Sequence, residues 1–181
     1  MKRAGSVHLV GVVREGNQPV ELDLRLQGGQ GVGLIRSNGT SLMVIKAGSH
    51  LYVQGDDTFY EQFGGAEAAR LLKGKWLRGS SGRSPLSKPA SLFSVDKLLD
   101  RALLPKDKVV KGGETLVGDV WAMELRGETT GSTVHVALTG EPYPLSVEAG
   151  REHTGKGHIR FSDWGEPVHV QAPPADTVVE P

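Results

Sequence analysis

Serine and carboxylate side chains that could support acyl-transfer chemistry are present, but the sequence does not arrange them for it. Ser80 and Ser81 lie in the stretch Gly79–Gly82, whose letters GSSG depart from the GxSxG pattern of a nucleophile elbow. Adjacent acids in a turn usually serve the turn itself. We therefore expect no enzyme, and a hydrolase built on Ser80 or Ser81 with a histidine and an acid is the least favoured alternative. The candidate acids in loop-like stretches are Asp56, Asp57, Asp163 and Glu166.

The histidines and the glycine cluster also lack the spacing that metal or phosphate binding requires. His153 and His158 lie close together in a polar stretch, whereas a zinc site needs about four convergent ligands. His135 falls on the polar side of its expected strand. The glycine-rich stretch Gly28–Gly33 (GGQGVG) is followed by a strand, and a phosphate loop needs a helix N-terminus there. We expect no metal, no cofactor, and a hairpin loop at these glycines.

Composition excludes several classes of partner. Lys+Arg and Asp+Glu each number 21, so the formal net charge is zero, whereas a nucleic-acid binder usually carries a basic patch. There is no cysteine, hence no disulfide, no thiolate metal site and no lipid-acceptor cysteine. No apolar run approaches the roughly 20 residues of a membrane span. Met1-Lys2-Arg3 is basic, but no apolar signal-peptide core follows it.

Most of the chain shows the two-residue alternation of half-buried β-strands. In Pro19–Gln27, the side chains of Val20, Leu22, Leu24 and Leu26 face one way and polar side chains face the other, as in an antiparallel sheet. Asn38-Gly39 is a strong hairpin signal. We expect strands over Ser6–Glu15, Pro19–Gln27, Val32–Ser37, Thr40–Ala47, Leu51–Val53, Lys75–Arg78, Lys108–Val117, Asp119–Arg126, Thr133–Leu138, Leu145–Ala149, Gly157–Ser162 and Pro167–Ala172.

Helical segments separate the two strand-rich halves. In Asp56–Phe63 the aromatic residues are spaced to share either a helical turn or a short apolar loop. Ala66–Lys73 has good helix formers, and Gly74 follows as a stop. Ser91–Leu104 has the strongest apolar periodicity of three and four residues, and such a helix has to cover a face of the sheet. We therefore expect residues 1–181 to form a single α+β domain, a single curved antiparallel β-sheet (half-barrel) with helices packed on its concave face. A β-sandwich with decorated loops is the structural alternative, and residues 176–181 are expected to fray.

The apolar side chains of the helical region allow two interpretations. Most apolar helix faces simply form the core. Alternatively, sheet and helices are held apart and enclose an acyl-chain pocket, since ligand sites are mostly apolar concavities. The pattern alone favours the packed core.

Three stretches resemble motifs of a known family. They are Gly48–Phe63 (GSHLYVQGDDTFYEQF) running into Gly74-Lys75-Trp76, Glu141–Val147 (EPYPLSV), and Gly157–Pro174 (GHIRFSDWGEPVHVQAPP). In this order, they resemble the LppX/LprA/LprF/LprG lipoproteins of actinobacteria, which have a LolA/LolB-like fold. Members of that family begin with a signal peptide, a lipobox cysteine and an N-terminal helix. Here only Met1–Gly5 precedes the first strand, so we expect that helix to be truncated.

The resemblance implies an extracytoplasmic, membrane-anchored lipoprotein that binds or carries a lipid or lipidated glycan. We further expect a monomer. The family's cavity is defined by its apolar lining, so the resemblance nominates lining positions and no catalytic residue. The alternative is a cell-envelope interaction or sensor domain on the same scaffold with a filled cavity. The nominated lining residues are Leu24, Val44, Phe59, Phe63, Leu71, Trp76, Leu92, Leu98, Leu99, Leu103, Trp121 and Met123.

Overall fold

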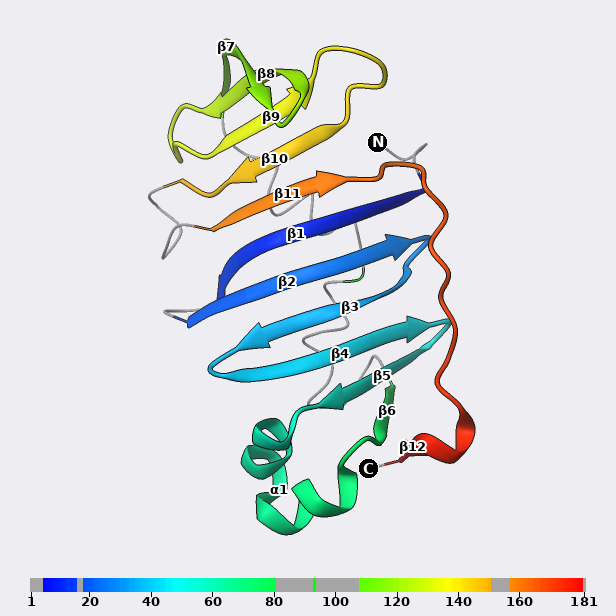
Figure 1. Ribbon diagram of the computed structural model, residues 1–181. Coiled ribbons are helices and arrows are strands. Elements are labelled where there is room, and N and C mark those ends of the chain that lie inside the picture. The colour runs from blue at the N-terminus through cyan, green and yellow to red at the C-terminus, as the bar shows by residue number, and fades with distance from the viewer. Residues whose placement is uncertain (1–4, 16–17, 81–92, 94–107, 151–156, 181) are drawn as a thin grey trace.

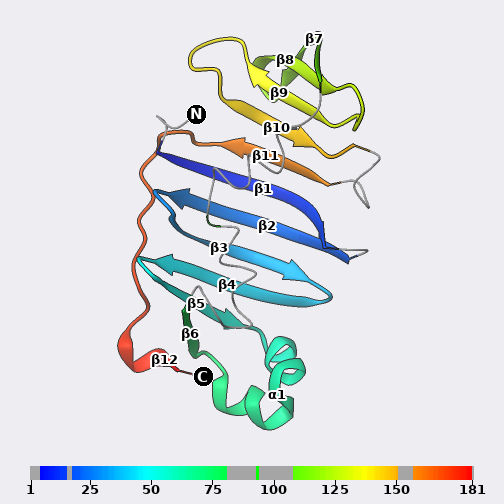
Figure 2. The same cartoon turned by 180° about the vertical axis from the view of Figure 1, so that it is seen from behind.

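The computed structural model describes residues 5–15, 18–80, 93, 108–150 and 157–180, and its strands form one large twisted sheet (Figures 1 and 2). Twelve strands are hydrogen-bonded in the order β12-β6-β5-β4-β3-β2-β1-β11-β10-β9-β8-β7. Their bounds are β1 Ser6–Glu15, β2 Gln18–Gln27, β3 Gln30–Ser37, β4 Thr40–Ala47, β5 His50–Gly55, β6 Trp76–Ser80, β7 Val109–Val117, β8 Val120–Gly127, β9 Thr133–Ala137, β10 Pro144–Glu148, β11 His158–Ser162 and β12 Val178–Val179.

Two antiparallel meanders make up this sheet. Strands β1 to β6 follow one another in space as in sequence, and so do β7 to β11. The pairing of β1 with β11 joins the two meanders. The strands predicted over Ser6–Glu15 and Thr40–Ala47 are confirmed at the same bounds. Pro167–Ala172, in contrast, contains no strand.

Tight turns with left-handed backbone connect the strands of the first meander. Gly28 and Gly29 link β2 to β3 with φ of 56° and 78°, and Asn38 and Gly39 link β3 to β4 with φ of 51° and 74°. Positive φ at both central residues is what a type I′ hairpin turn requires. The hairpin at Asn38-Gly39 is therefore confirmed. The hairpin loop predicted at the glycine cluster is present but is limited to Gly28 and Gly29, because β3 begins at Gln30 and includes Gly31 and Gly33.

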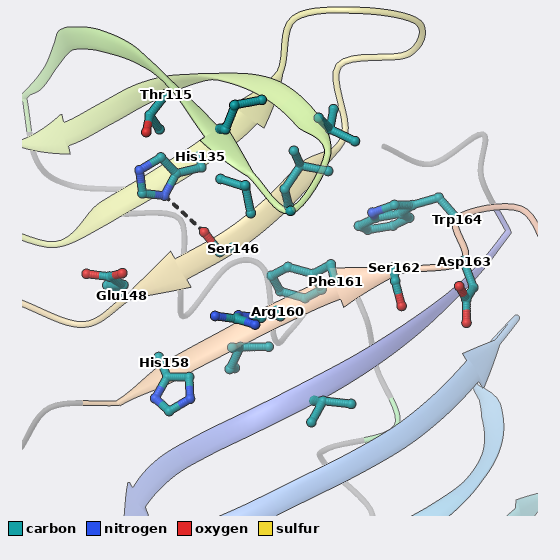
Figure 3. Close-up of a pocket in the computed structure, with 17 residues that line it drawn as sticks. Thr115, His135, Ser146, Glu148, His158, Arg160, Phe161, Ser162, Asp163 and Trp164 are labelled. Atoms are coloured by element: carbon teal, nitrogen blue, oxygen red, sulfur yellow. Dashed lines mark hydrogen bonds between the residues drawn. The ribbon is translucent and has the colours of Figure 1, made fainter.

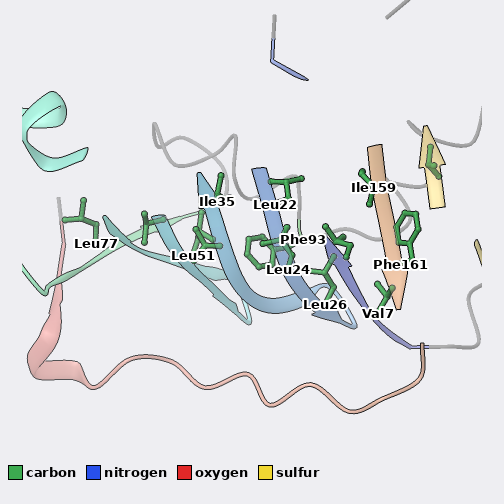
Figure 4. Close-up of a cluster of buried hydrophobic side chains, with 14 of the residues drawn as sticks. Val7, Leu22, Leu24, Leu26, Ile35, Leu51, Leu77, Phe93, Ile159 and Phe161 are labelled. Carbon is green, nitrogen blue, oxygen red and sulfur yellow. The ribbon is translucent and has the colours of Figure 1, made fainter. Parts of the chain in front are cut away.

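One face of the sheet, here called the inner face, carries the hydrophobic core (Figure 4). Across neighbouring strands the register aligns Phe161, Leu9, Leu24, Gly33, Val44, Val53 and Leu77 into a single row. Leu9, Leu24 and Val53 are completely buried. Every second residue of each strand faces inward, and the register places these inward-facing positions opposite one another on adjacent strands. The strand alternation therefore produces the row directly.

The expectation of helices packed on the concave face of an antiparallel sheet is wrong. The helix α1 (Asp57–Leu72) lies at the β5–β6 end of the sheet, where it contacts β4 and β5 (Figures 1 and 2). It connects two adjacent antiparallel strands, and its backbone is broken at Gly64 and Gly65. Among the side chains of α1 that the structure describes, Tyr60 and Ala69 are buried, whereas Leu71 is 66% exposed. The sheet itself is mixed, because β12 pairs in parallel with β6.

The strongest helix prediction, Ser91–Leu104, lies outside the described residues except at Phe93. Phe93 is 1% exposed and belongs to the core cluster of the inner face. A Cβ atom built on Gly31 would lie 3.0 Å from the Phe93 ring, so the ring packs directly on β3. Figure 4 shows it beside Leu24 and Leu26.

A C-terminal segment, residues 163–177, follows β11 and passes the ends of the strands to reach β12 (Figure 1). The Gly165 amide donates to the Ser6 carbonyl at 3.1 Å, and the Val168 amide donates to Gln27 Oε1 at 2.7 Å. A short 3₁₀ turn, η2 (Ala175–Thr177), precedes β12. Residues 176–179, which we expected to fray, thus contain part of η2 and all of β12.

Candidate functional site

The sheet face opposite the core, here called the outer face, carries a cavity of about 1010 Å³ that is open to solvent (Figure 3). Strands β9, β10 and β11 form its floor. The tip of the β7–β8 hairpin forms a wall, and Val10 of β1 lines the cavity at the edge of the floor. We call it the outer cavity. Its volume lies at the upper end of the range of small-molecule sites, which is about 300–1,000 Å³.

A row of polar side chains crosses the floor from strand to strand. Arg160 of β11 lies opposite both Val10 of β1 and Ser146 of β10. Ser146 lies opposite His135 of β9, and His135 lies opposite Glu124 of β8. Directly opposed residues on one face of a sheet have Cβ atoms about 4.5–5.5 Å apart. The register therefore brings four polar side chains into contact range although they are far apart in sequence.

Ser146, His135 and Glu124 are linked by short contacts. Ser146 Oγ lies 2.9 Å from His135 Nδ1, and His135 Nε2 lies 3.9 Å from Glu124 Oε2. The other oxygen of Glu124 accepts from Arg126 NH2 at 2.6 Å. Ser146 is 9% exposed, and the side chains of His135 and Glu124 are 13% and 24% exposed. These groups are thus largely shielded from bulk water while Ser146 and His135 still line the cavity.

Arg160 differs from the other charged residues of this row because it has no charged partner. It makes no ion pair or side-chain hydrogen bond with any residue in the part of the chain that the structure describes. It lines the outer cavity beside Ser146 and is exposed. Its guanidinium is therefore available to an anionic or strongly polar group of a ligand.

Apolar side chains form the wall above this floor. Val117 and Val120 lie opposite each other at the tip of the β7–β8 hairpin and line the cavity. Val120 is 36% exposed, and Val10, which lies opposite Arg160 at the β1 side of the floor, is 44% exposed. The outer cavity therefore has an apolar wall and a polar floor, and both are accessible from solvent.

The turn after β11 forms one rim of the outer cavity and is held by charged contacts. Asp163, whose φ is 54°, accepts from Arg25 NH1 at 3.0 Å and lies 3.3 Å from His8 Nδ1. His8 Nε2 lies 2.8 Å from Asp23 Oδ1. Trp164 follows in the same turn and donates from Nε1 to the Pro144 carbonyl at 3.0 Å. The rim is thereby fixed to β1, β2 and the start of β10.

None of the nominated lining residues whose side chains the structure describes lines the outer cavity. Leu24 and Val44 share a row of the buried core, and Trp76, 9% exposed, lies in β6. Phe59 packs partly buried against that core. Leu71 and Trp121 are exposed and Met123 is half-buried. Leu92, Leu98, Leu99, Leu103 and the side chain of Phe63 lie outside the described residues.

The serines and acids considered as catalytic candidates from the sequence either have structural roles or lie away from the floor of the outer cavity. Asp56 is the N-cap of α1 and accepts from the Phe59 amide at 2.8 Å, and Asp57 pairs with Lys73 at 2.7 Å. Ser80 ends β6, and Ser81 lies outside the described residues. Among the candidate acids, Asp163 lines the outer cavity and Glu166 follows it in the same turn.

Sequence reasoning missed Ser146 and Arg160, and it placed His135 on a polar strand face without a role. The available signal was the alternation itself, which puts polar residues outward at His135, Ser146 and Arg160. That signal does not reveal which strands are neighbours. The pairing of β9, β10 and β11 has to be known before these residues form a row.

Comparison of the chain with protein-family models and with curated proteins gives no match. None of the described helices combines the length and the apolar character that a membrane span requires. Within the described ranges, no three potential metal-ligating side chains come together.

Proposed function

We propose that the protein binds an amphiphilic ligand, a lipid or lipidated glycan, in the outer cavity. The observation that carries the proposal is the division of this cavity into an apolar wall and a polar floor at a volume of about 1010 Å³. An acyl chain suits the apolar side chains of Val10, Val117 and Val120, and a polar headgroup suits the polar residues of the floor. The resemblance of three stretches to motifs of the lipoprotein family supports the same class of ligand, and it extends the proposal to a carrier outside the cytoplasmic membrane.

Burial of an acyl chain supplies the main driving force. Each CH₂ group removed from water contributes about 0.8 kcal/mol, against which stand the costs of association and of ordering the chain. Val10 and Val120 are substantially exposed in the free protein, so a ligand that covers them also removes protein apolar surface from water. Binding through the wall does not require a charged ligand, which agrees with the zero net charge of the chain.

The floor suits a headgroup that both donates and accepts hydrogen bonds. Arg160 supplies donors, Glu148 supplies acceptors, and Ser146 and His135 can do either. Sugar hydroxyls and phosphodiesters present such complementary groups. The floor therefore selects for headgroup chemistry, whereas the wall selects for an alkyl chain of any kind.

A matched set of arginine substitutions tests the proposal. Val120→Arg places a charge on the cavity wall, and Trp121→Arg places one at the next residue of β8, which is 52% exposed and does not line the cavity. Met43→Arg is a second control, 50% exposed on the outer face and outside the cavity. We expect Val120→Arg to weaken binding of palmitoyl lysophosphatidylglycerol at least about tenfold, which corresponds to about 1.4 kcal/mol.

Native mass spectrometry and a titration below the critical micelle concentration measure this binding. Trp121→Arg and Met43→Arg should bind the lysolipid as the unmodified protein does. Absence of lysolipid binding by the unmodified protein, or equal losses in all three variants, would overturn the proposal.

A second candidate function is that of a cell-envelope interaction or sensor domain, and one observation favours it. Large apolar side chains are exposed together at the β7–β9 end of the sheet, where β7 is the terminal strand. They include Leu116 and Trp121, which lie opposite each other in the hairpin. Under this alternative, Trp121→Arg impairs association with a protein partner, and lysolipid does not bind to any variant.

A further inference from the structure

We propose that Ser146, His135 and Glu124 form a hydrolytic site that cleaves a carboxylic ester in the ligand of the outer cavity. Ser146 is the nucleophile, His135 the general base and acid, and Glu124 the positioning residue. This inference rests on the proposed function, because the apolar wall has to hold the acyl chain whose ester carbonyl then lies over the floor.

The distances from Ser146 to His135 and from His135 to Glu124 are consistent with the roles of nucleophile, base and positioning residue. Ser146 Oγ and His135 Nδ1 are 2.9 Å apart, within the range required of a nucleophile and its base. His135 Nε2 lies 3.9 Å from Glu124 Oε2, longer than a hydrogen bond, and such contacts are often loose before substrate binds. With its proton on Nε2, facing the carboxylate, the imidazole presents Nδ1 as an acceptor to the Ser146 hydroxyl.

Positive charge is available where an oxyanion would form. Arg160 lies directly opposite Ser146 on the same face, and it has no ion-pair partner among the described residues. The tetrahedral intermediate of acyl transfer places a negative charge on the former carbonyl oxygen, next to the nucleophile. Arg160 is the residue paired with Ser146 on the adjacent strand and lines the same cavity, so its guanidinium can stabilise that charge when substrate is bound.

The reaction balances without a cofactor. Ser146 Oγ bonds to the ester carbonyl carbon while its proton moves to His135 Nδ1. The carbon–oxygen bond to the alcohol then breaks, and the imidazolium returns the proton to the leaving alkoxide. Water attacks the resulting acyl-serine with the same proton transfers, so that one ester and one water yield one alcohol and one carboxylic acid. The cavity is open to solvent, so water can reach the acyl-serine.

A second serine–histidine contact on the outer face is less suited to this role. Ser162 Oγ lies 3.4 Å from His8 Nδ1, and the same nitrogen faces Asp163 Oδ2 at 3.3 Å. His8 is thus flanked by Asp23 and Asp163, and Nδ1 faces Asp163 Oδ2 as well as Ser162 Oγ. Ser162 is also exposed. The contact between Ser146 and His135 is shorter than that between Ser162 and His8, and Ser146 is more buried than Ser162.

The test combines covalent labelling with ester hydrolysis on the full chain. A fluorophosphonate probe reacts with an activated serine, with loss of fluoride, and peptide mass mapping identifies the residue. We expect a single adduct at Ser146 and hydrolysis of p-nitrophenyl octanoate above the buffer rate. Ser146→Ala and His135→Ala should return the rate to that of buffer, and Ser37→Ala, remote from the cavity, should leave it unchanged.

Glu124 needs a readout that a purely structural role would not produce. Glu124→Gln should lower kcat several-fold with KM and the melting temperature unchanged, and Glu124→Asp should restore part of kcat. An unlabelled protein, an adduct at any other residue, or an undiminished rate in Ser146→Ala would overturn the inference. Lysolipid binding by the unmodified protein separates the two proposals, because binding without labelling or hydrolysis overturns the hydrolytic site and leaves the binding function standing.

Discussion

Tyr60 shows how a single buried hydroxyl joins helix and sheet. Its side chain is completely buried, and its hydroxyl donates to the Lys75 carbonyl at 2.7 Å and accepts from the Gly55 amide at 3.0 Å. Gly55 ends β5 and Lys75 precedes β6, so these two bonds fix both ends of the connection that contains α1. Burial raises the pKa of the Tyr60 hydroxyl, and the hydrogen bond from Gly55 opposes part of that rise.

Tyr60→Phe should lower the free energy of unfolding by about 1–3 kcal/mol, because it leaves a backbone donor and a backbone acceptor unpaired. Tyr143→Phe is the matched control. The Tyr143 ring stacks on Trp164 at 4.9 Å, which phenylalanine preserves, and we expect a change below about 0.5 kcal/mol. Urea unfolding measures both. Equal effects in the two variants would contradict the role assigned to the Tyr60 hydroxyl.

The raised pKa of Tyr60 also sets the direction of a pH effect. The unfolded chain loses the phenolic proton near pH 10.0, while the folded chain retains it to higher pH. The contribution of this group to stability is therefore complete below pH 10.0 and is lost as the pH rises through the folded pKa. The Tyr60→Phe variant should show a weaker decline in unfolding free energy over that alkaline range.

At the residue scale, the sequence identified the core better than the site. Leu24 was assigned to an apolar strand face, and it is completely buried there. Ser146 and Arg160 were not singled out, because each is an ordinary outward-facing polar residue within its own strand. Their proximity depends on long-range strand pairing, which single-strand patterns do not contain.

At the scale of elements, turn chemistry was the most predictive signal. Asn38-Gly39 was expected to close a hairpin, and both residues have positive φ. Gly39→Ala should destabilise the fold by about 1 kcal/mol, since a Cβ atom disfavours the left-handed conformation. Gly113→Ala is the control, because Gly113 has no positive φ and a Cβ atom there meets nothing within 4 Å. If thermal unfolding shows the same loss of stability in Gly39→Ala and Gly113→Ala, the left-handed backbone conformation of Gly39 is not the cause.

The position of the helix relative to the sheet was the feature that the sequence predicted least well. The segments Asp56–Phe63 and Ala66–Lys73 do form α1, and Gly64 and Gly65 break it between them. Periodicity indicates that a helix has an apolar side but does not identify the surface on which it packs. Here the connection between two adjacent strands keeps α1 at the end of the sheet.

At the scale of the whole molecule, the two meanders are joined into one sheet by a single strand pairing. Twelve strands are continuous because β1 pairs with β11, and the inner-face row continues across that pairing. The local strand sequence predicts each meander, since consecutive antiparallel strands usually lie side by side. The junction of the first strand with the eleventh carries no comparable local signal, so the order of the full sheet could not be derived.

Position in the sheet should set the rate of amide hydrogen exchange. We expect the slowest exchange in β1 and β2, which are paired on both sides and carry completely buried leucines, and the fastest in β7, which is terminal and largely exposed. Hydrogen-exchange mass spectrometry measures this order. Protection of β7 equal to that of β2 would show that the exposed end is covered in solution, and would favour the interaction function.

The C-terminal segment gives the sheet a tether between two distant points. It leaves β11 near the middle of the sheet and rejoins the structure where Val178 and Val179 pair with Trp76 and Leu77 of β6. The Lys75 ammonium adds a bond to the Asp176 carbonyl at 3.2 Å. Any motion that moves β6 away from β11 must therefore stretch this tether or detach β12. Proteolytic cleavage within the tether would leave every antiparallel pairing intact while releasing the mechanical coupling between the centre and one end of the molecule.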